Sequence, residues 1–327
     1  MNSRIYLPLI VSSFVVIPNA GKAQSNPNVQ RYLEQAFSAA VVMTDSDVLT
    51  LGIQDFNPND WFDLSDEIGS EDSIELRQQI AVTTLPYTFE LSDSASPKRH
   101  QIFTRASILV SQQDYEIDDS YQDDFQREYI LGGFVAYRYI NKISDNWTIT
   151  PGIGTHLQYF RNEHEYRSEF SNSMVKPLLD GLIFNSSAWA VSVEPHITVN
   201  YLQRKDWGSW GIESSAHYFY GFGGGSANEG EIGNPEGWYI ANGISLRYNV
   251  TQWNRSLQTI YTNWRRVDLG ADTTQPLGTH YYYETSIGWL MTPPFESDWI
   301  ENIGIGLSFN YGSALKGGSI VLFFNQD

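Results

Sequence analysis

The sequence predicts an all-β protein: a transmembrane antiparallel β-barrel of about twelve strands, with one short helix near the N-terminus. Three observations predict this fold. Apolar residues alternate with small or polar ones along one segment after another, aromatic residues gather at the ends of the apolar faces, and short connections alternate with long ones. Alternation with a period of two places one type of residue on each face of a strand.

The chain is acidic, with 38 carboxylate side chains against 20 Lys and Arg, and so negative a surface argues against a nucleic-acid partner. It contains no cysteine, which excludes disulfide scaffolds, thiol catalysis and cysteine-ligated metal sites. Aromatic residues are frequent, although the mean hydropathy is −0.33. This combination suits a barrel with lipid outside and polar side chains or water inside.

The first residues have the order of a secretory signal peptide. Arg4 precedes an apolar run over residues 5–17, Pro18 breaks the run, and residues 21–23 offer a cleavage site with small residues. The run is too short to span a bilayer as a helix, and no later stretch reaches the roughly 18 apolar residues that such a helix needs. We therefore expect residues 1–23 to be a signal peptide, cleaved near Ala23 in a Gram-negative cell.

Residues 24–45 form an N-terminal segment with the one amphipathic helix that we expect. Asn26 is placed to cap this helix, and Pro27 suits its first turn. Apolar residues then recur at helical spacing through residues 28–43. Two interpretations remain open from the sequence: a surface helix packed on the sheet, or a plug inside the barrel lumen.

Residues 46–327 supply the predicted barrel. We expect strands over residues 49–53, 80–91, 101–112, 129–140, 147–159, 189–201, 210–220, 238–248, 257–269, 281–291, 303–311 and 318–324. The alternation is clearest over 147–159 and 189–201, whereas 257–269 has an unclear phase and is placed by spacing. Pro151 and Pro195 lie inside strand patterns, so each requires a bulge or a missing ladder bond.

Aromatic residues and loop lengths favour a membrane barrel over a soluble β-fold. Interfacial aromatic girdles are predicted at Trp147, Tyr159, Trp189, Tyr201, Trp238 and Tyr248, near the ends of three apolar faces. Connections 142–146, 204–208 and 251–254 are short, whereas 54–76, 114–126, 162–186 and 221–237 are long. Membrane barrels have short periplasmic turns and long outer loops. An even number of strands would return both termini to the periplasm.

The C-terminal strand carries a polar-x-Gly-x-x-apolar-x-apolar pattern, read on Lys316, Gly318, Val321 and Phe323. With a cleaved signal, a short helix and twelve strands, the chain resembles the translocator barrel of bacterial autotransporters. Only residues 24–48 precede the first predicted strand, so it resembles the solitary outer-membrane type that lacks a passenger. The resemblance implies a twelve-stranded barrel in the bacterial outer membrane with an internal helix, and it carries over no catalytic residue.

The inward phase of the strands holds several charged or titratable residues: Arg105, Arg138, His156, Glu194, His196, Glu213, His217, Arg247 and Glu284. We interpret them as hydrogen-bonded lumen fillers, because a polar lumen must satisfy its own groups. No GxSxG, HExxH or phosphate-loop motif occurs. We expect no enzyme activity, no cofactor and no resident metal, apart from weak divalent-cation binding at the acidic loop Asp114–Asp124.

The sequence therefore predicts an integral outer-membrane barrel with a structural or transport-related role. Its expected partners are the bilayer, lipopolysaccharide and, through the C-terminal strand, the barrel assembly machinery. Three alternatives remain: a porin-like channel for small solutes, an outer-membrane hydrolase that uses an inward His and carboxylate, and a surface adhesin that acts through the long loops.

Overall fold

A computed structural model describes residues 25–45, 49–50, 52–60, 65–93, 96–115, 122–295, 300 and 302–324. These residues form a 12-stranded antiparallel sheet in the order β1-β12-β11-β10-β9-β8-β7-β6-β5-β4-β3-β2. The predicted signal peptide lies outside the described residues. No helix among them is both long and apolar enough to cross a membrane.

From β2 to β12, each strand pairs with the next one along the chain, and β1 pairs with β12. They are β1 (Gln54–Phe56), β2 (Ile80–Glu90), β3 (Lys98–Tyr115), β4 (Asp124–Lys142), β5 (Trp147–Glu165), β6 (Ser187–Lys205), β7 (Gly208–Gly225), β8 (Glu236–Trp253), β9 (Ser256–Ala271), β10 (Tyr281–Met291), β11 (Ile303–Tyr311) and β12 (Gly317–Phe324). The helical elements are α1 (Pro27–Met43), α2 (Glu71–Gln78), α3 (Lys176–Leu179), the short 3₁₀ turns η2 (Pro58–Asp60) and η4 (Ala227–Gly230), and a π turn, η3 (Ser171–Val175).

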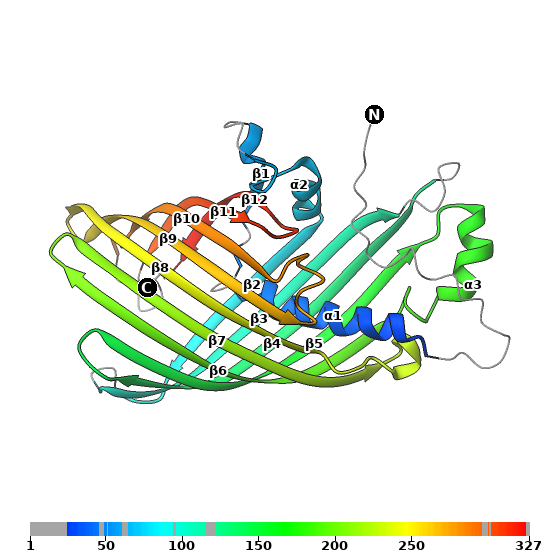
Figure 1. Ribbon diagram of the computed structural model, residues 1–327, viewed down its shortest axis with the longest axis horizontal. Helices are drawn as coiled ribbons and strands as arrows, with labels where there is room; N and C mark the ends of the chain where they lie inside the picture. The colour runs from blue at the N-terminus through cyan, green and yellow to red at the C-terminus, as the bar shows by residue number, and fades with distance from the viewer. Residues whose placement is uncertain are drawn as a thin grey trace.

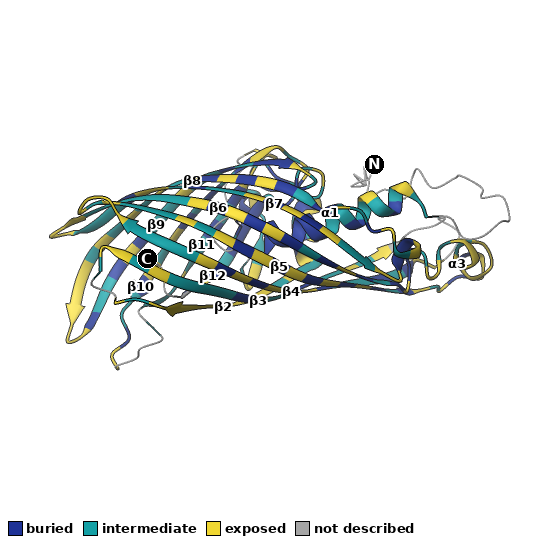
Figure 2. Ribbon diagram, turned by 90° about the horizontal axis from the view of Figure 1, so that it is seen from below, coloured by how far each residue is buried: buried dark blue, intermediate teal, exposed yellow. Residues whose placement is uncertain are grey.

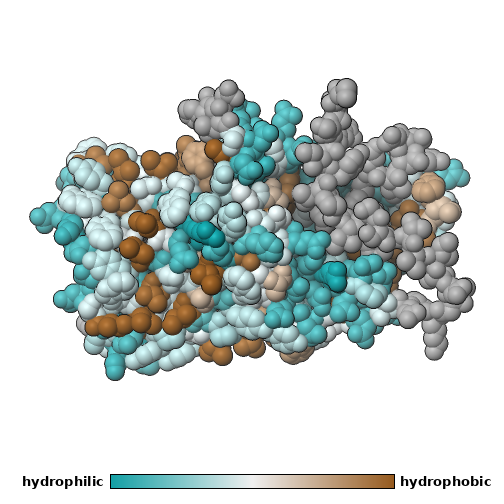
Figure 3. All heavy atoms as spheres, in the orientation of Figure 1, coloured by the Kyte–Doolittle hydropathy of each residue, from teal (hydrophilic) through white to brown (hydrophobic). Residues whose placement is uncertain are grey.

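The sheet curls around α1, which lies inside the curve near the long connections (Figure 1). Buried and exposed positions alternate along most strands (Figure 2). The exposed positions carry large apolar side chains such as Leu85, Leu157, Ile244 and Leu322. Figure 3 shows apolar side chains spread over the end of the wall where the short turns lie. The expected alternation, apolar outside and small or polar inside, therefore runs through the structure.

The first strand begins five residues later than predicted and ends three residues later. Residues 49–53 were expected to pair, but β1 covers Gln54–Phe56, opposite Gly318–Ile320 of β12. Leu49 is instead buried in the core, and its backbone N–H bonds to the carbonyl of Asp45 at 3.0 Å. The Leu49 side chain therefore fills the lumen rather than a strand face. Leu51 lies outside the described residues.

The helix α2 was not predicted, because its buried face carries the polar residues Ser73 and Arg77 rather than an apolar stripe. Ser70 and Ser73 form a capping box: each hydroxyl accepts a hydrogen bond from the other's backbone N–H. The two-serine spacing, followed by acidic residues, was the available sequence signal. The helix contacts both β1 and β2, the two ends of the strand order.

We call the place where β1 and β2, the two ends of the strand order, meet at α2 the seam. Arg77 of α2 stabilises this seam. Its side chain is buried, and Nε donates to Asp55 of β1 at 2.9 Å. One terminal nitrogen donates to the Leu315 carbonyl at 2.5 Å, and the other donates to Ser319 of β12. No ladder joins β1 to β2 among the described residues. Arg77 and α2 therefore link the two ends of the strand order.

The unclear phase of β9 has a structural cause. Tyr261, Val267 and Leu269 point inward and are buried, whereas Arg266 and Asp268 lie on the outer face and pair at 2.6 Å. Val267 and Leu269 belong to the same buried cluster as the residues of α1. The inner face is apolar here because it packs against a helix instead of water.

The two prolines and the glycine run also have defined places. The β6–β7 ladder skips Glu194 and Pro195, and the β4–β5 ladder skips Pro151, which confirms the expected missing bonds. Residues 221–225 were placed in the long connection 221–237, but they continue β7 up to Gly225 and pair with β6. The glycines let β7 lie under the buried Ile232 of the following connection.

The helix α1 begins at the end of the barrel that carries the long connections. The Asn26 backbone N–H donates to the side chain of Asn228, in the connection between β7 and β8, at 2.6 Å. The strand β12 finishes at the opposite end. The expectation that both termini return to the short-turn end therefore holds for the strands and is wrong for the start of α1.

Replacing Arg77 by Met tests the seam. Breaking a buried, hydrogen-bonded ion pair costs about 3–5 kcal/mol, so we expect the folded band in heat-modifiability gels to be lost about 5–10 °C lower. The matched control is Arg161→Met, which removes an exposed arginine paired with Glu163 at 3.0 Å. Equal transition temperatures for the two variants would contradict the seam role.

Candidate functional site in the barrel lumen

The candidate site is built around the buried second half of α1. The Asn26 side chain caps the helix by accepting a hydrogen bond from the Asn28 N–H at 2.9 Å. Every residue from Phe37 to Met43 is buried. A helix on the outside of a sheet keeps one face in water, so burial all round identifies α1 as a plug within the sheet. Full burial of Leu33 or Phe37 contributes about 1.5–3 kcal/mol each.

Polar side chains from several strands bind the plug from different sides. The Tyr32 hydroxyl donates to Glu128 of β4, and Gln158 of β5 donates to the Phe37 carbonyl at 3.0 Å. Gln35 donates to Gln275, in the connection between β9 and β10, at 2.7 Å. Glu128 and Gln158 lie on the neighbouring strands β4 and β5, whereas Gln275 follows β9 on another part of the sheet. The helix is therefore held from two sides of the lumen and not against one wall.

Beyond the C-terminal end of α1, two buried carboxylates anchor the chain that leaves the helix. Asp45 lies 3.3 Å from the Arg105 guanidinium and accepts a hydrogen bond from the Tyr239 hydroxyl at 2.8 Å. Glu284 accepts hydrogen bonds from the backbone N–H and the hydroxyl of Thr50, at 2.8 and 2.7 Å. Buried charges need such partners, since an unpaired one is strongly destabilising.

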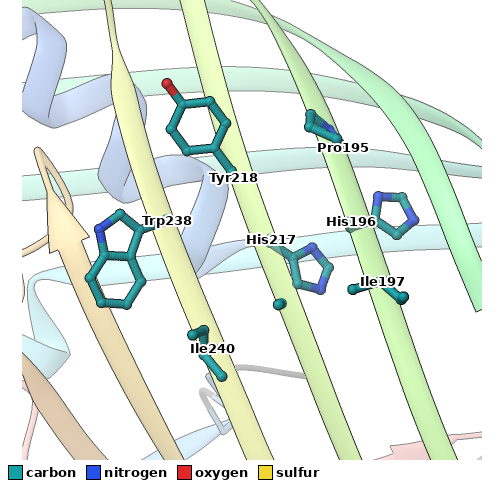
Figure 4. Close-up of a pocket in the computed structure, with 8 residues that line it drawn as sticks. Pro195, His196, Ile197, His217, Tyr218, Trp238 and Ile240 are labelled. Atoms are coloured by element: carbon teal, nitrogen blue, oxygen red, sulfur yellow. The ribbon is translucent and has the colours of Figure 1, made fainter.

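Next to the Asp45 anchor, four predicted inward residues meet in one cluster. The Glu194 carboxylate is buried, and its two oxygens contact His156 Nε2 at 2.8 Å and His217 Nδ1 at 2.9 Å. His196 is also buried and lies opposite His217 in the β6–β7 register. The rings of His196 and His217 stack with their centroids 5.2 Å apart, and both rings are drawn in Figure 4. We call these four residues the histidine cluster.

The other predicted inward residues do not join the histidine cluster. Arg138 lies over the Phe103 ring at 3.9 Å, and Arg247 lies over the Tyr261 ring at 5.7 Å. Glu213 accepts a hydrogen bond from Asn200 at 3.2 Å and is exposed. The lumen is thus filled around α1 and more open toward the short turns.

The predicted girdle residues lie on the outer face in two rows. Trp147 pairs with Tyr201 near the short turns, and Tyr159 pairs with Trp189 toward the long connections. Trp238 and Tyr248 lie toward opposite ends of β8 and are exposed. Their place at a lipid–water interface remains a prediction.

Two of the C-terminal pattern residues, Val321 and Phe323, point inward, and Gly318 lies on the opposite face of β12. Val321 and Phe323 are buried with Tyr261 and Leu290. Gly288 and Gly306 leave room for the Phe323 ring, and Gly318 leaves room for the ring of Phe56. The sequence pattern therefore has a packing role, in which its aromatic and its glycine close the end of the sheet.

A comparison with protein families decides the identity of the fold. The family model described as "Solitary outer membrane autotransporter beta-barrel domain" matches residues 34–326. The chain belongs to this family. A search of curated proteins and a search of solved structures each found no match. The protein is therefore an outer-membrane autotransporter-type β-barrel located in the bacterial outer membrane.

The long connections of this autotransporter-type barrel are held by their own contacts. Asp124 is buried and accepts hydrogen bonds from the Arg167 backbone at 2.9 Å and from Ser171, with His164 at 3.1 Å. Burial, reinforced by the neighbouring Asp180, raises the pKa of the Tyr166 phenol well above its usual value. One end of the predicted cation-binding loop is thus already engaged, while residues 116–121 lie outside the described residues.

Sequence reasoning did not identify the residues whose contacts hold α1 in the barrel: Tyr32, Asp45, Glu128, Gln158 and Tyr239. Tyr239 shares the inward phase of Arg247, so its hydroxyl was available as a signal. Asp45 directly follows the last helical turn, but its partners on β3 and β8 depend on where the plug sits. A helix position inside a barrel is not encoded in strand periodicity.

Changing Tyr239 to Phe tests the anchor below the plug. Loss of a hydrogen bond to a charged group costs about 1.5–3 kcal/mol, so amides in the last turn of α1 should exchange about 10- to 100-fold faster in hydrogen exchange. The control is Tyr218→Phe, on the outer face of β7, whose hydroxyl donates to Glu236 at 2.9 Å. An unchanged exchange rate in Tyr239→Phe would contradict the anchoring role of the Tyr239 hydroxyl.

Proposed function

We propose that this protein is a sealed outer-membrane barrel, structural in its resting state, rather than an open channel. The single observation that carries the proposal is the burial of every α1 residue from Phe37 to Met43 inside the sheet. A seated helix fills the cross-section where solute would pass, and no water-filled path is needed to satisfy the inner face. The signal peptide over residues 1–23 would bring the chain to the envelope.

Polar contacts indicate that α1 is fixed in the lumen and does not slide along it. Tyr32 and the Phe37 carbonyl bind partners on the neighbouring strands β4 and β5, and Gln35 binds a partner in the connection between β9 and β10. Moving the helix along the lumen would break these bonds together, and each buried partner left unsatisfied costs about 1–3 kcal/mol. The plug is therefore expected to open rarely, if at all, without a partner that replaces those contacts.

The alternatives receive less support. A porin-like channel would require the helix to leave the lumen. For a hydrolase, the hydrogen bonds of the histidine cluster run to Glu194, and none of them joins a serine or threonine hydroxyl among the described residues. Such a hydroxyl is the usual nucleophile beside a His–carboxylate pair. We therefore propose no enzyme activity for the lumen.

Partners follow from the location. The outward apolar face is expected to contact lipid, with lipopolysaccharide at the long-connection end. We propose that β12 is the strand recognised by the barrel assembly machinery. Weak divalent-cation binding at Asp114–Asp124 also remains a proposal, in which the carboxylates would bridge lipopolysaccharide phosphates.

Planar-bilayer conductance tests the sealed state. We expect the refolded wild-type barrel to insert without steady openings. The variant Leu33→Ala/Phe37→Ala, in which each truncation costs about 2–5 kcal/mol, should show discrete openings because the plug loses its two largest buried contacts. The control Arg31→Ala removes an exposed side chain of the same helix and should stay silent. Steady openings of the wild-type barrel would contradict the proposal.

A further inference from the structure

The histidine cluster has a feature that filling the lumen does not explain. His196 is buried, yet its nearest polar contacts are both 3.4 Å long, from Nδ1 to the carbonyl oxygen and to the carboxylate of Glu194. Its other ring nitrogen, Nε2, has no hydrogen-bond partner in the part of the chain that the structure describes. A buried imidazole without a short hydrogen bond is unusual, because such groups are normally satisfied.

We propose that Glu194, His196 and His217 bind a divalent transition-metal ion. Each offers one ligand atom, and these atoms lie within 4.8 Å of one another. Tetrahedral bonds of about 2.0–2.1 Å separate neighbouring ligand atoms by about 3.3 Å. The Glu194 carboxylate is 3.4 Å from His196 Nδ1 and 2.9 Å from His217 Nδ1. The first separation already fits, and the second must widen by about 0.4 Å.

The surrounding residues hold these ligands in place. His156 contacts the second oxygen of Glu194 at 2.8 Å, and the Phe134 ring stacks on His156 with centroids 4.2 Å apart. The Tyr239 ring stacks on His217 at 4.3 Å. Gly152 leaves the space that the His196 ring occupies. A partner on the non-coordinating carboxylate oxygen is the kind of outer contact that fixes metal ligands.

The local charge and the donor atoms indicate the class of metal. Asp45 and Arg105 offset each other nearby. With neutral histidines, the Glu194 carboxylate is the one charge of the cluster itself, and the Arg138 guanidinium is a neighbouring positive charge. Two imidazoles and one carboxylate suit borderline ions such as Zn²⁺, Co²⁺ or Ni²⁺ and offer little to Ca²⁺ or Mg²⁺. When Nδ1 of a neutral imidazole binds the ion, the ring proton resides on Nε2. The ion would therefore replace the long Nδ1 contacts of His196, and its Nε2–H would stay without a partner among the described residues.

The histidine cluster is accessible from the short-turn end of the lumen. His217 is only partly buried, and the inward Glu213 on the same strand is exposed toward the short-turn end. Three protein ligands leave a fourth position for water, as in open zinc sites. On the outer face, Pro195 interrupts the ladder beside a groove of about 440 Å³ lined by His196, His217, Trp238 and Ile240 among others (Figure 4). The β6–β7 ladder is therefore already interrupted next to His196, whereas the β5–β6 ladder is continuous there.

Zinc titration of the refolded full-length barrel, measured by isothermal calorimetry, tests the proposal. We expect one Zn²⁺ per barrel, displaced by a chelator, with Mg²⁺ showing no saturable binding. His217→Gln should weaken Zn²⁺ binding about 100-fold or more, since even outer-contact losses weaken it 10- to 100-fold. The control His280→Gln removes an exposed histidine and should leave the affinity unchanged.

X-ray absorption of the wild-type zinc complex provides a second measurement that needs no variant to fold. The expected first shell contains two imidazole nitrogens with oxygen at the remaining positions. An all-oxygen shell, no saturable binding, or an affinity unchanged by His217→Gln would each overturn the proposal.

Discussion

The constraint on which the rest of the structure depends is that the polar groups of the inner wall need hydrogen-bond partners. A barrel in lipid turns its apolar side chains outward, so its inner face is left with hydroxyls, amides and charges that need partners. In this protein a helix supplies many of those partners where water is excluded. Gln158 bonds to the Phe37 carbonyl, and Glu128 accepts from Tyr32. The plug is therefore part of the wall's hydrogen bonding, and removing it would leave both sides unsatisfied.

The buried charges follow the same rule at the C-terminal end of α1. Asp45 ends the helical segment inside the lumen, where an unpaired carboxylate would be strongly destabilising. Arg105 and Tyr239 compensate it from two different strands. Tyr239 also stacks on His217, so the anchor of the plug and the histidine cluster share a side chain. A change in the cluster, such as metal binding, would act directly on the end of the plug.

Strand periodicity predicted the sheet well, because lipid on one side imposes the alternation regardless of other contacts. Eleven of the expected strands overlap β2 to β12. Prediction failed where another element replaced lipid or water. On β9 the plug makes the inner face apolar, as Val267 and Leu269 show, so the alternation is lost. The helix α2 presents Arg77 to the seam, and a polar buried face gives no amphipathic pattern.

The site was predictable only in part, for the same reason. Periodicity placed His156, Glu194, His196 and His217 inward, and the two-residue turn at 206–207 fixes the β6–β7 register that brings His196 opposite His217. The partners on α1 could not be predicted, because the depth of a helix in a lumen depends on packing across the whole barrel. The inward turn of Val321 and Phe323 likewise depends on the glycines of β10 and β11.

The most direct test of the plugged barrel uses the absence of cysteine from the chain. A single cysteine is introduced at Ser38, which is fully buried on α1, or at the exposed Arg31 of the same helix. A large, water-soluble maleimide is then added to the folded barrel. A seated plug predicts that Arg31→Cys is labelled and that Ser38→Cys is labelled only after unfolding. Equal labelling of the two variants in the folded barrel would contradict the account.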